Sequence, residues 1–277
     1  MKKERRHTIT EKYPFIAIVI WFLLAIITAD IFTPLIKVSG LLSNLSDPDA
    51  PSNLGSILGA ILFLMIMKLW YAPEYKGILK PAISTKQVLL ACVPLIVYSI
   101  IVLILTLIQY DFYFNGSLSN TLMALSAGFF EEIMVRASII PIAMGFFKSE
   151  KRAWLVPILS GTFFGLLHIG NIFNGATLLN SIAQVVVNIF TGFYYGTLLV
   201  ATGSIVPGIL LHGLYDYICL TTDKSLASGI MVSELSASEI IWNLILVFGL
   251  AVSAAVILKK LGTPKIIKIW KDKWSKE

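Results

Sequence analysis

The chain of 277 residues is 57% hydrophobic and only 14% charged, and its mean hydropathy is +0.82. A soluble domain carries about twice that share of charged residues, so the composition excludes an ordinary soluble protein and indicates one that lies in a bilayer. The formal net charge of +6 comes from basic loops and a lysine-rich tail, which suit an anionic membrane surface, and no nucleic-acid partner is expected.

The apolar residues come in eight blocks, most of them roughly 17 to 25 residues long, which is the length that crosses about 30 Å of hydrocarbon. We therefore predict an all-α, polytopic bundle of about eight transmembrane helices, near residues 14–36, 53–71, 87–109, 119–147, 153–169, 179–201, 204–222 and 239–260. The first block is too long for a cleaved signal peptide, so we expect it to be retained. The fourth block is long and contains Pro141, which predicts a tilt, a kink near Ala137 or a cytosolic continuation.

The distribution of basic residues predicts the orientation, because short cytoplasmic loops are enriched in Lys and Arg. With eight spans, one face of the membrane receives both tails and every basic loop. The only basic residues on the opposite face are then Lys37 and Lys224. That second face carries the acidic residues Asp47, Asp49, Asp111, Asp223, Glu234 and Glu239. Both termini are therefore predicted to be cytoplasmic, with membrane lipids as partners.

Two smaller features add to this picture. The C-terminal tail mixes lysines with isoleucines and tryptophans, which fits either a short interfacial helix on the membrane or a disordered solubilising tail. Cys92 and Cys219 both lie in apolar spans, so we interpret them as small buried hydrophobic residues rather than a disulfide.

A few ionisable residues fall inside the predicted spans and cannot reach an interface. Each costs at least ~2.5 kcal/mol at the centre of a bilayer, and such residues usually mark a functional interior site. The set comprises Glu131, Glu132, Arg136, His168, His212 and Asp216. Asp30 is a borderline case near the end of the first span, and His7 lies in the basic N-terminal tail.

The spacing of these residues predicts how they pair. Glu132 and Arg136 are four residues apart, one above the other on a helix, and can form an ion pair that lowers the cost of burying both. Glu131 points about 100° away from Glu132 and is left to face another group. His212 and Asp216 are also four residues apart and share a helix face.

A carboxylate and two histidines that converge from separate helices can do one of three things. They can position and deprotonate a water molecule, bind Zn²⁺ through a mixed nitrogen and oxygen site, or relay protons. The spacing of the residues does not choose among these alternatives.

Three motifs resemble those of a known family. "EEIMVR" fits E-E-x-x-x-R, "FGLLH" fits F-x-x-x-H, and "HGLYD" fits H-x-x-x-[N/D/B], in that order and on separate spans. These are the motifs of the CPBP intramembrane proteases, the CAAX protease and bacteriocin-processing group, also called the Abi family. The resemblance covers about residues 118–222 and implies a protease core there. It lies between N-terminal membrane helices at 14–117 and an external loop with the last helix at 223–260, with basic cytosolic tails at 1–13 and 261–277.

The resemblance also implies a role for each site residue. Glu131 matches the residue thought to activate a water molecule together with His168, and Glu132 with Arg136 matches the supporting pair. His212 and the residue at position 216 match the group proposed to stabilise the oxyanion. The eukaryotic converting enzymes have asparagine where this chain has Asp216, and an ionised aspartate accepts hydrogen bonds but cannot donate them.

Asp216 therefore has three open alternatives: protonation by burial, orientation of His212 through a hydrogen bond, or a share in a metal site. Of these we favour orientation of His212. The family is commonly called a metalloprotease, so zinc held by His168 and His212 stays an open alternative, although the sequence lacks H-E-x-x-H.

The leading hypothesis is an intramembrane endopeptidase that cleaves a membrane-associated or lipophilic peptide in a bacterial plasma membrane. A second hypothesis is a non-enzymatic relative that acts in bacteriocin immunity or regulation through the same cavity. A third is a proton-coupled transporter, which is expected to show an inverted repeat and paired broken helices that the sequence does not contain.

Overall fold

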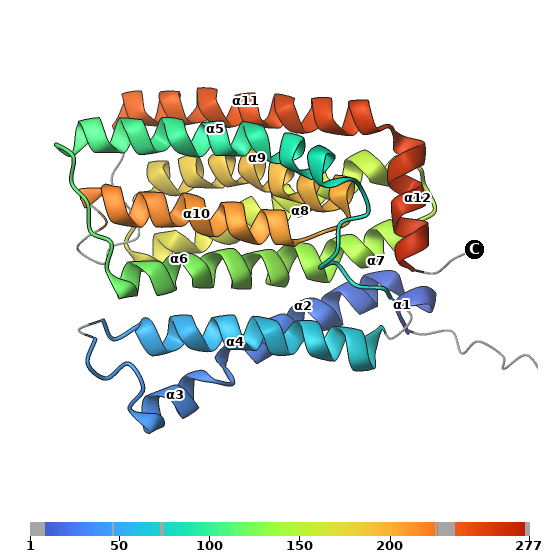
Figure 1. Ribbon diagram of the computed structural model, residues 1–277, viewed down its shortest axis with the longest axis horizontal. Helices are drawn as coiled ribbons and strands as arrows, with labels where there is room; N and C mark the ends of the chain where they lie inside the picture. The colour runs from blue at the N-terminus through green and yellow to red at the C-terminus, as the bar shows by residue number, and fades with distance from the viewer. Residues whose placement is uncertain (1–8, 46, 73–74, 225, 227–235, 275–277) are drawn as a thin grey trace, which may run out of the picture.

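The computed structural model describes residues 9–45, 47–72, 75–224, 226 and 236–274 of the chain. Its described part is a helical bundle without a strand (Figure 1). In chain order the helices are α1 (Ile9–Lys12), α2 (Pro14–Asp30), α3 (Thr33–Ser39), α4 (Ala50–Ile66), η1 (Met67–Tyr71), α5 (Thr85–Gln109), α6 (Leu118–Glu131), η2 (Glu132–Ala137), α7 (Ser138–Phe146), α8 (Arg152–Leu167), η3 (His168–Asn174), α9 (Leu178–Thr202), α10 (Val206–Thr222), α11 (Ala237–Leu261) and α12 (Thr263–Lys273).

All eight apolar blocks predicted from the sequence are helical. Among the described residues, six segments are long and apolar enough to cross a membrane: Pro14–Ser39, Ala50–Tyr71, Thr85–Gln109, Arg152–Phe173, Leu178–Thr202 and Ala237–Leu261. The other two predicted spans are the continuous helix formed by α6, η2 and α7, and the shorter helix α10. The prediction of an all-α bundle is confirmed, while the exact number of spans and the cytoplasmic termini stay predictions.

The lateral surface of the bundle is unusually apolar. Large hydrophobic side chains are exposed along the outer faces of the long helices, among them Phe15, Leu89, Ile104, Ile245 and Phe248. Exposed apolar patches of this extent are rare on soluble monomers, because water solvates them poorly. The surface is the one expected for helices that face lipid.

The segments rich in basic residues gather at one end of the bundle, where α12 crosses the ends of the long helices (Figure 1). The Trp270 indole N–H donates to the carbonyl of Val200 at 3.0 Å, and the Trp274 N–H donates to the carbonyl of Pro141 at 2.9 Å. The tail is therefore a helix, as one sequence alternative proposed, but its tryptophans pack against protein rather than lipid. His7, the basic residues at 2, 3, 5 and 6, and Glu234 lie outside the described residues.

Glycines allow the helices around the site to approach closely. A Cβ atom added at Gly128 on α6 would lie 2.7 Å from the carbonyl oxygen of Ile209 and 2.8 Å from the nitrogen of Gly213, both on α10. Real side chains do not tolerate such distances, so only glycine permits this backbone contact. The contact brings the end of α6, where Glu131 lies, against His212 on α10.

The long fourth block is a continuous helix with a π-helical turn in place of a sharp break. The π-helical segment η2 begins at Glu132 and ends at Ala137, directly before α7 and four residues before Pro141. The irregularity lies where the sequence predicted a kink, because Pro141 lacks the N–H that would bond to the carbonyl of Ala137.

Candidate active site

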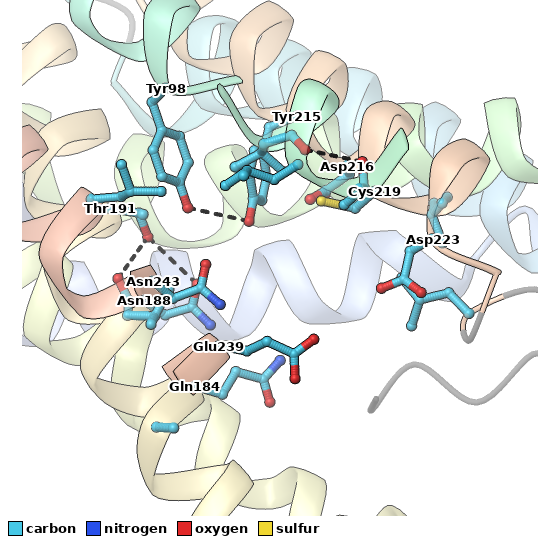
Figure 2. Close-up of a pocket in the computed structure, with 18 of the residues that line it drawn as sticks. Tyr98, Gln184, Asn188, Thr191, Tyr215, Asp216, Cys219, Asp223, Glu239 and Asn243 are labelled. Carbon is cyan, nitrogen blue, oxygen red and sulfur yellow. Dashed lines mark hydrogen bonds between the residues drawn. The ribbon is translucent and has the colours of Figure 1, made fainter. Parts of the chain in front are cut away.

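A cavity of about 760 Å³ lies between α5, α6, α8, α9, α10 and α11. Of the six residues predicted from the sequence, Glu131, His168, His212 and Asp216 line it. Figure 2 shows Asp216 on its wall, with Tyr98 and Tyr215 on one side and the polar side chains of α9 and α11 on the other. Glu132 and Arg136 do not line the cavity, and both are almost completely buried behind it.

Glu132 forms the predicted ion pair with Arg136 and also has a second partner. Its Oε1 atom lies 3.0 Å from Arg136 Nη1, and the same atom lies 3.0 Å from His212 Nδ1. A Cβ atom at Gly208 would come within 3.0 Å of the other carboxylate oxygen, so the glycine leaves room for this arrangement. Glu132 therefore links α10 to the Arg136 side chain, a connection that the spacing of residues along one helix did not reveal.

Arg136 is held mainly by aromatic contact and by charge. Its guanidinium carbon lies 4.0 Å from the centre of the Phe164 ring, which is a cation–π contact. Although Nη1 is close to Glu132, no guanidinium nitrogen makes a well-directed hydrogen bond to another described residue. Arg136 therefore acts as a fixed positive charge beneath the site.

His212 is the centre of the constellation. Its Nδ1–H donates to Glu132, while Nε2 lies 3.5 Å from Asp216 Oδ2 and 3.7 Å from Glu131 Oε2. The ring stacks on Tyr195 with centroids 4.8 Å apart. Carboxylates and an aromatic ring thus fix both the position and the orientation of this imidazole.

Asp216, which the sequence favoured as the group that orients His212, is not the only carboxylate beside this ring. The close, 3.0 Å hydrogen bond that sets the ring comes from Glu132 on α6. Asp216 lies on the opposite, cavity side of the ring, at the longer distance of 3.5 Å from Nε2. Spacing along α10 identified the neighbour of His212 but could not show which ring nitrogen it faces.

His168 begins η3, directly after α8. Its Nδ1–H donates to the carbonyl of Phe164 at 2.9 Å, and its ring meets the Phe164 ring edge to face. Because Nδ1 is engaged by the backbone, Nε2 is the nitrogen left to act on a molecule in the cavity.

The comparison with protein families gives one match, over the part of the chain that carries these residues. Residues 114–218 match the family described as type II CAAX prenyl endopeptidase Rce1-like. This match supports the resemblance to the CPBP, or CAAX protease, family that the three motifs indicated. No curated protein and no solved structure matches the chain. The matched segment contains all six predicted site residues, and the apolar helices agree with an integral membrane protein.

A zinc site fits the donors around this cavity poorly. Within the described part of the chain, no group of three or more His, Cys, Asp or Glu side chains is arranged to hold a metal ion. A catalytic zinc ion takes about three protein ligands in tetrahedral geometry, so His168 and His212 do not complete such a site with the carboxylates as placed. No step proposed below passes through a metal.

The charges of the site explain why the imidazoles and carboxylates lie together. Glu131, Glu132 and Asp216 are three carboxylates, and Arg136 is the one permanently charged cation among the six predicted residues. Burying all three as anions beside neutral imidazoles would leave uncompensated negative charge in a low-dielectric region. Imidazole nitrogens beside the carboxylates can carry protons that offset this charge, an arrangement that suits proton transfer.

Several cavity residues were not predicted to have a role. Asn188 lines the cavity and accepts a long hydrogen bond of 3.5 Å from Thr191 on its own helix. Asn171, by contrast, donates a hydrogen bond from η3 to Gln184 on α9, at 2.7 Å. In the sequence, a single amide in an apolar span gives no sign of whether it contacts another helix or a cavity. The only signal was the repeat of polar residues along one face of α9.

Proposed function

We propose that the protein is an intramembrane endopeptidase that hydrolyses a peptide bond through a water molecule activated by Glu131 and His168. The observation that carries the proposal is the convergence of Glu131, His168, His212 and Asp216 on one cavity of about 760 Å³. A cavity of this size accommodates part of an extended peptide.

The first step uses Glu131 and His168, which both line the cavity. The water molecule lies between the Glu131 carboxylate and His168 Nε2, and it attacks the peptide carbonyl carbon while Glu131 takes its proton. The backbone hydrogen bond to Nδ1 holds the His168 ring in place during this transfer. The proton then passes to the leaving amine as the carbon–nitrogen bond breaks.

The second role belongs to His212. In the proposal this ring carries a proton on each nitrogen: Nδ1–H donates to Glu132, and Nε2–H donates to the oxyanion of the tetrahedral intermediate. Glu131 and Asp216 lie beside Nε2 and offset the charge of the imidazolium. Asp216 thus acts through the charge and position of His212.

The substrate enters at the end of the cavity opposite the basic segments. Gln109 and Glu239 line the cavity at that end, where Gln109 is exposed and Glu239 is partly exposed. With the predicted orientation this is the outer face of the membrane, and the composition rich in lysine and isoleucine suggests a bacterial plasma membrane. The substrate is proposed to be a membrane-associated or lipophilic peptide; a prenylated C-terminus, which the family description names, is one form of it.

The proposal is tested by comparing the peptides released from membranes that contain the wild type, Glu131→Ala or His168→Ala. Both variants are expected to insert and fold as the wild type does but to release no specific product. Glu150→Ala, in the exposed segment between α7 and α8, is the matched loss of a carboxylate away from the cavity and should retain cleavage. Cleavage by both site variants at the wild-type rate contradicts the proposal.

The same variants separate the protease from the non-enzymatic alternative. If Glu131→Ala abolishes cleavage and the cellular phenotype together, the phenotype depends on proteolysis. If the phenotype survives in Glu131→Ala but is lost when bulky residues fill the cavity, the protein acts by binding a partner.

A further inference from the structure

A row of polar side chains on α9 forms one wall of the cavity. Asn180, Gln184, Asn188 and Thr191 all line it, and they are spaced by four, four and three residues. This spacing puts them on one face of the helix. The part of α5 that lines the cavity is mainly apolar, with Ile101, Val102 and Leu105.

Hydrogen bonds within the protein leave this row incompletely satisfied. Asn180 is only 7% exposed, and its Oδ1 atom has no hydrogen-bond partner in the described part of the chain. Gln184 accepts one hydrogen bond from Asn171, and Asn188 accepts one from Thr191 at 3.5 Å. Buried amides normally find partners in the protein, in water or in a ligand, so an incompletely bonded row on a cavity wall indicates a ligand with many polar groups.

The row leads from the mouth of the cavity to the reacting groups. Asn171 contacts Gln184, and Gly165 packs against Val185 and Ile189, so His168 lies at the level of the middle of the row. One turn beyond Thr191, Tyr195 stacks on His212. At the other end, Asn180 lies in the first turn of α9.

The spacing of the row matches the repeat of an extended peptide backbone. Residues four apart on a helix are separated by about 6 Å along its axis. An extended peptide presents equivalent main-chain groups on one edge at every second residue, about 6.6 Å apart. From Asn180 to Thr191 the row is about 16 Å long, which corresponds to about five extended residues.

We propose that Asn180, Gln184, Asn188 and Thr191 form a positioning ladder, which hydrogen-bonds the main chain of an extended substrate peptide and aligns its scissile bond with Glu131 and His168. This inference rests on the proposed protease function. Amides suit this role because each has both donor and acceptor groups, as a peptide backbone does. The apolar remainder of the wall accepts side chains of varied shape, so the ladder recognises backbone length and shape more than sequence.

The ladder is tested with fluorogenic peptides of randomised sequence and fixed length, from about three to about eight residues, which bracket the ladder's length. In the wild type, KM is expected to fall as the peptide lengthens to about five residues. Asn188→Leu and Asn180→Leu should each raise KM for the longer peptides by about tenfold while kcat changes by less than about twofold, since they remove uniform binding. Peptides with N-methylated backbone amides should bind the wild type weakly and lose little further affinity in the variants.

Two controls separate positioning from stability. Ser181→Ala removes a buried polar group in the same turn as Asn180, but this residue does not line the cavity, so its KM should match the wild type at every length. Asn188→Gln keeps the amide and should recover part of the length dependence. Equal KM values for the wild type and both leucine variants at all lengths would overturn the ladder.

A binding measurement separates failure of the ladder from failure of the protease. The same peptides, carrying a photo-crosslinking residue, are bound to Glu131→Gln, which keeps the cavity but lacks the proposed base. If no peptide is cleaved yet crosslinking falls in Glu131→Gln/Asn188→Leu, the ladder is supported and the protease proposal is contradicted. If peptides are cleaved but their crosslinking does not depend on Asn188, the ladder is contradicted and the protease is supported.

Discussion

Replacing Glu132 with leucine should destabilise the protein strongly, because one buried carboxylate oxygen serves two partners. Glu132 Oε1 lies 3.0 Å from both Arg136 Nη1 and His212 Nδ1, and the Arg136 side chain is 0% exposed. Removing one member of such a buried pair leaves an uncompensated charge and costs about 3–5 kcal/mol. The lost hydrogen bond to His212 is not added to this figure, because both interactions share one atom.

The double variant Glu132→Leu/Arg136→Met should recover most of that stability. Replacing a buried ion pair by apolar residues of similar size is often close to neutral, because the cost of desolvating both charges disappears. Methionine can also keep contact with the Phe164 ring, over which the guanidinium lies at 4.0 Å. We expect the double variant to lie within about 2 kcal/mol of the wild type.

Unfolding in detergent micelles and cleavage of a reporter peptide, measured together, check both parts of this reasoning. The double variant should be folded yet inactive, because His212 Nδ1 has lost the carboxylate that orients it. Glu150→Leu, at an exposed position, is the control and should change stability by less than about 0.5 kcal/mol. A loss below about 1 kcal/mol in Glu132→Leu, or full cleavage by the double variant, would refute the reasoning.

Three further predictions concern packing, titration and orientation. Gly128→Ala should lower the unfolding temperature and the cleavage rate, because its Cβ would meet the backbone of α10 at 2.7 Å, whereas Gly249→Ala, with open space around it, should change neither. Burial lowers the pKa of Lys273 from 10.5 to about 8. The unfolded chain then binds more protons than the folded chain between these values, so stability should rise with pH across that window, and Lys273→Met should flatten the rise. The orientation is tested with single cysteines in a background with Cys92 and Cys219 replaced by alanine. A membrane-impermeant maleimide added to intact cells should label Glu239→Cys at the cavity mouth but not Lys265→Cys on α12. The reverse labelling pattern would contradict cytoplasmic termini.

The helices were predictable from the sequence because apolar block length is a strong and local signal. Each predicted block is a helix, and the expected irregularity near Ala137 is present as the π-helical turn before Pro141. Cys92 and Cys219 are free thiols, as expected. The environment of α12 was not predictable, because an amphipathic pattern shows that one face is apolar but not whether lipid or protein covers it.

The pairing of the site residues was predictable only within single helices. The ion pair between Glu132 and Arg136 follows from a four-residue spacing, and the structure contains it. The hydrogen bond from His212 to Glu132 joins residues 80 positions apart and depends on the contact between α6 and α10. No rule of local spacing contains that information, so the sequence indicated only Asp216, on the same helix, as a carboxylate that could orient His212.

The π-helical turn explains how two adjacent glutamates come to have different surroundings. Glu131 is the last residue of α6 and lines the cavity, whereas Glu132 is the first residue of η2 and points away from the cavity to Arg136 and His212. A π-helical turn holds more residues than an α-helical one and is found frequently at functional sites. Pro141 favours an irregularity at this place, because its ring would clash with the carbonyl of Ala137 in a regular helix. The same local change thus accommodates the proline and separates the proposed general base from the carboxylate that holds His212.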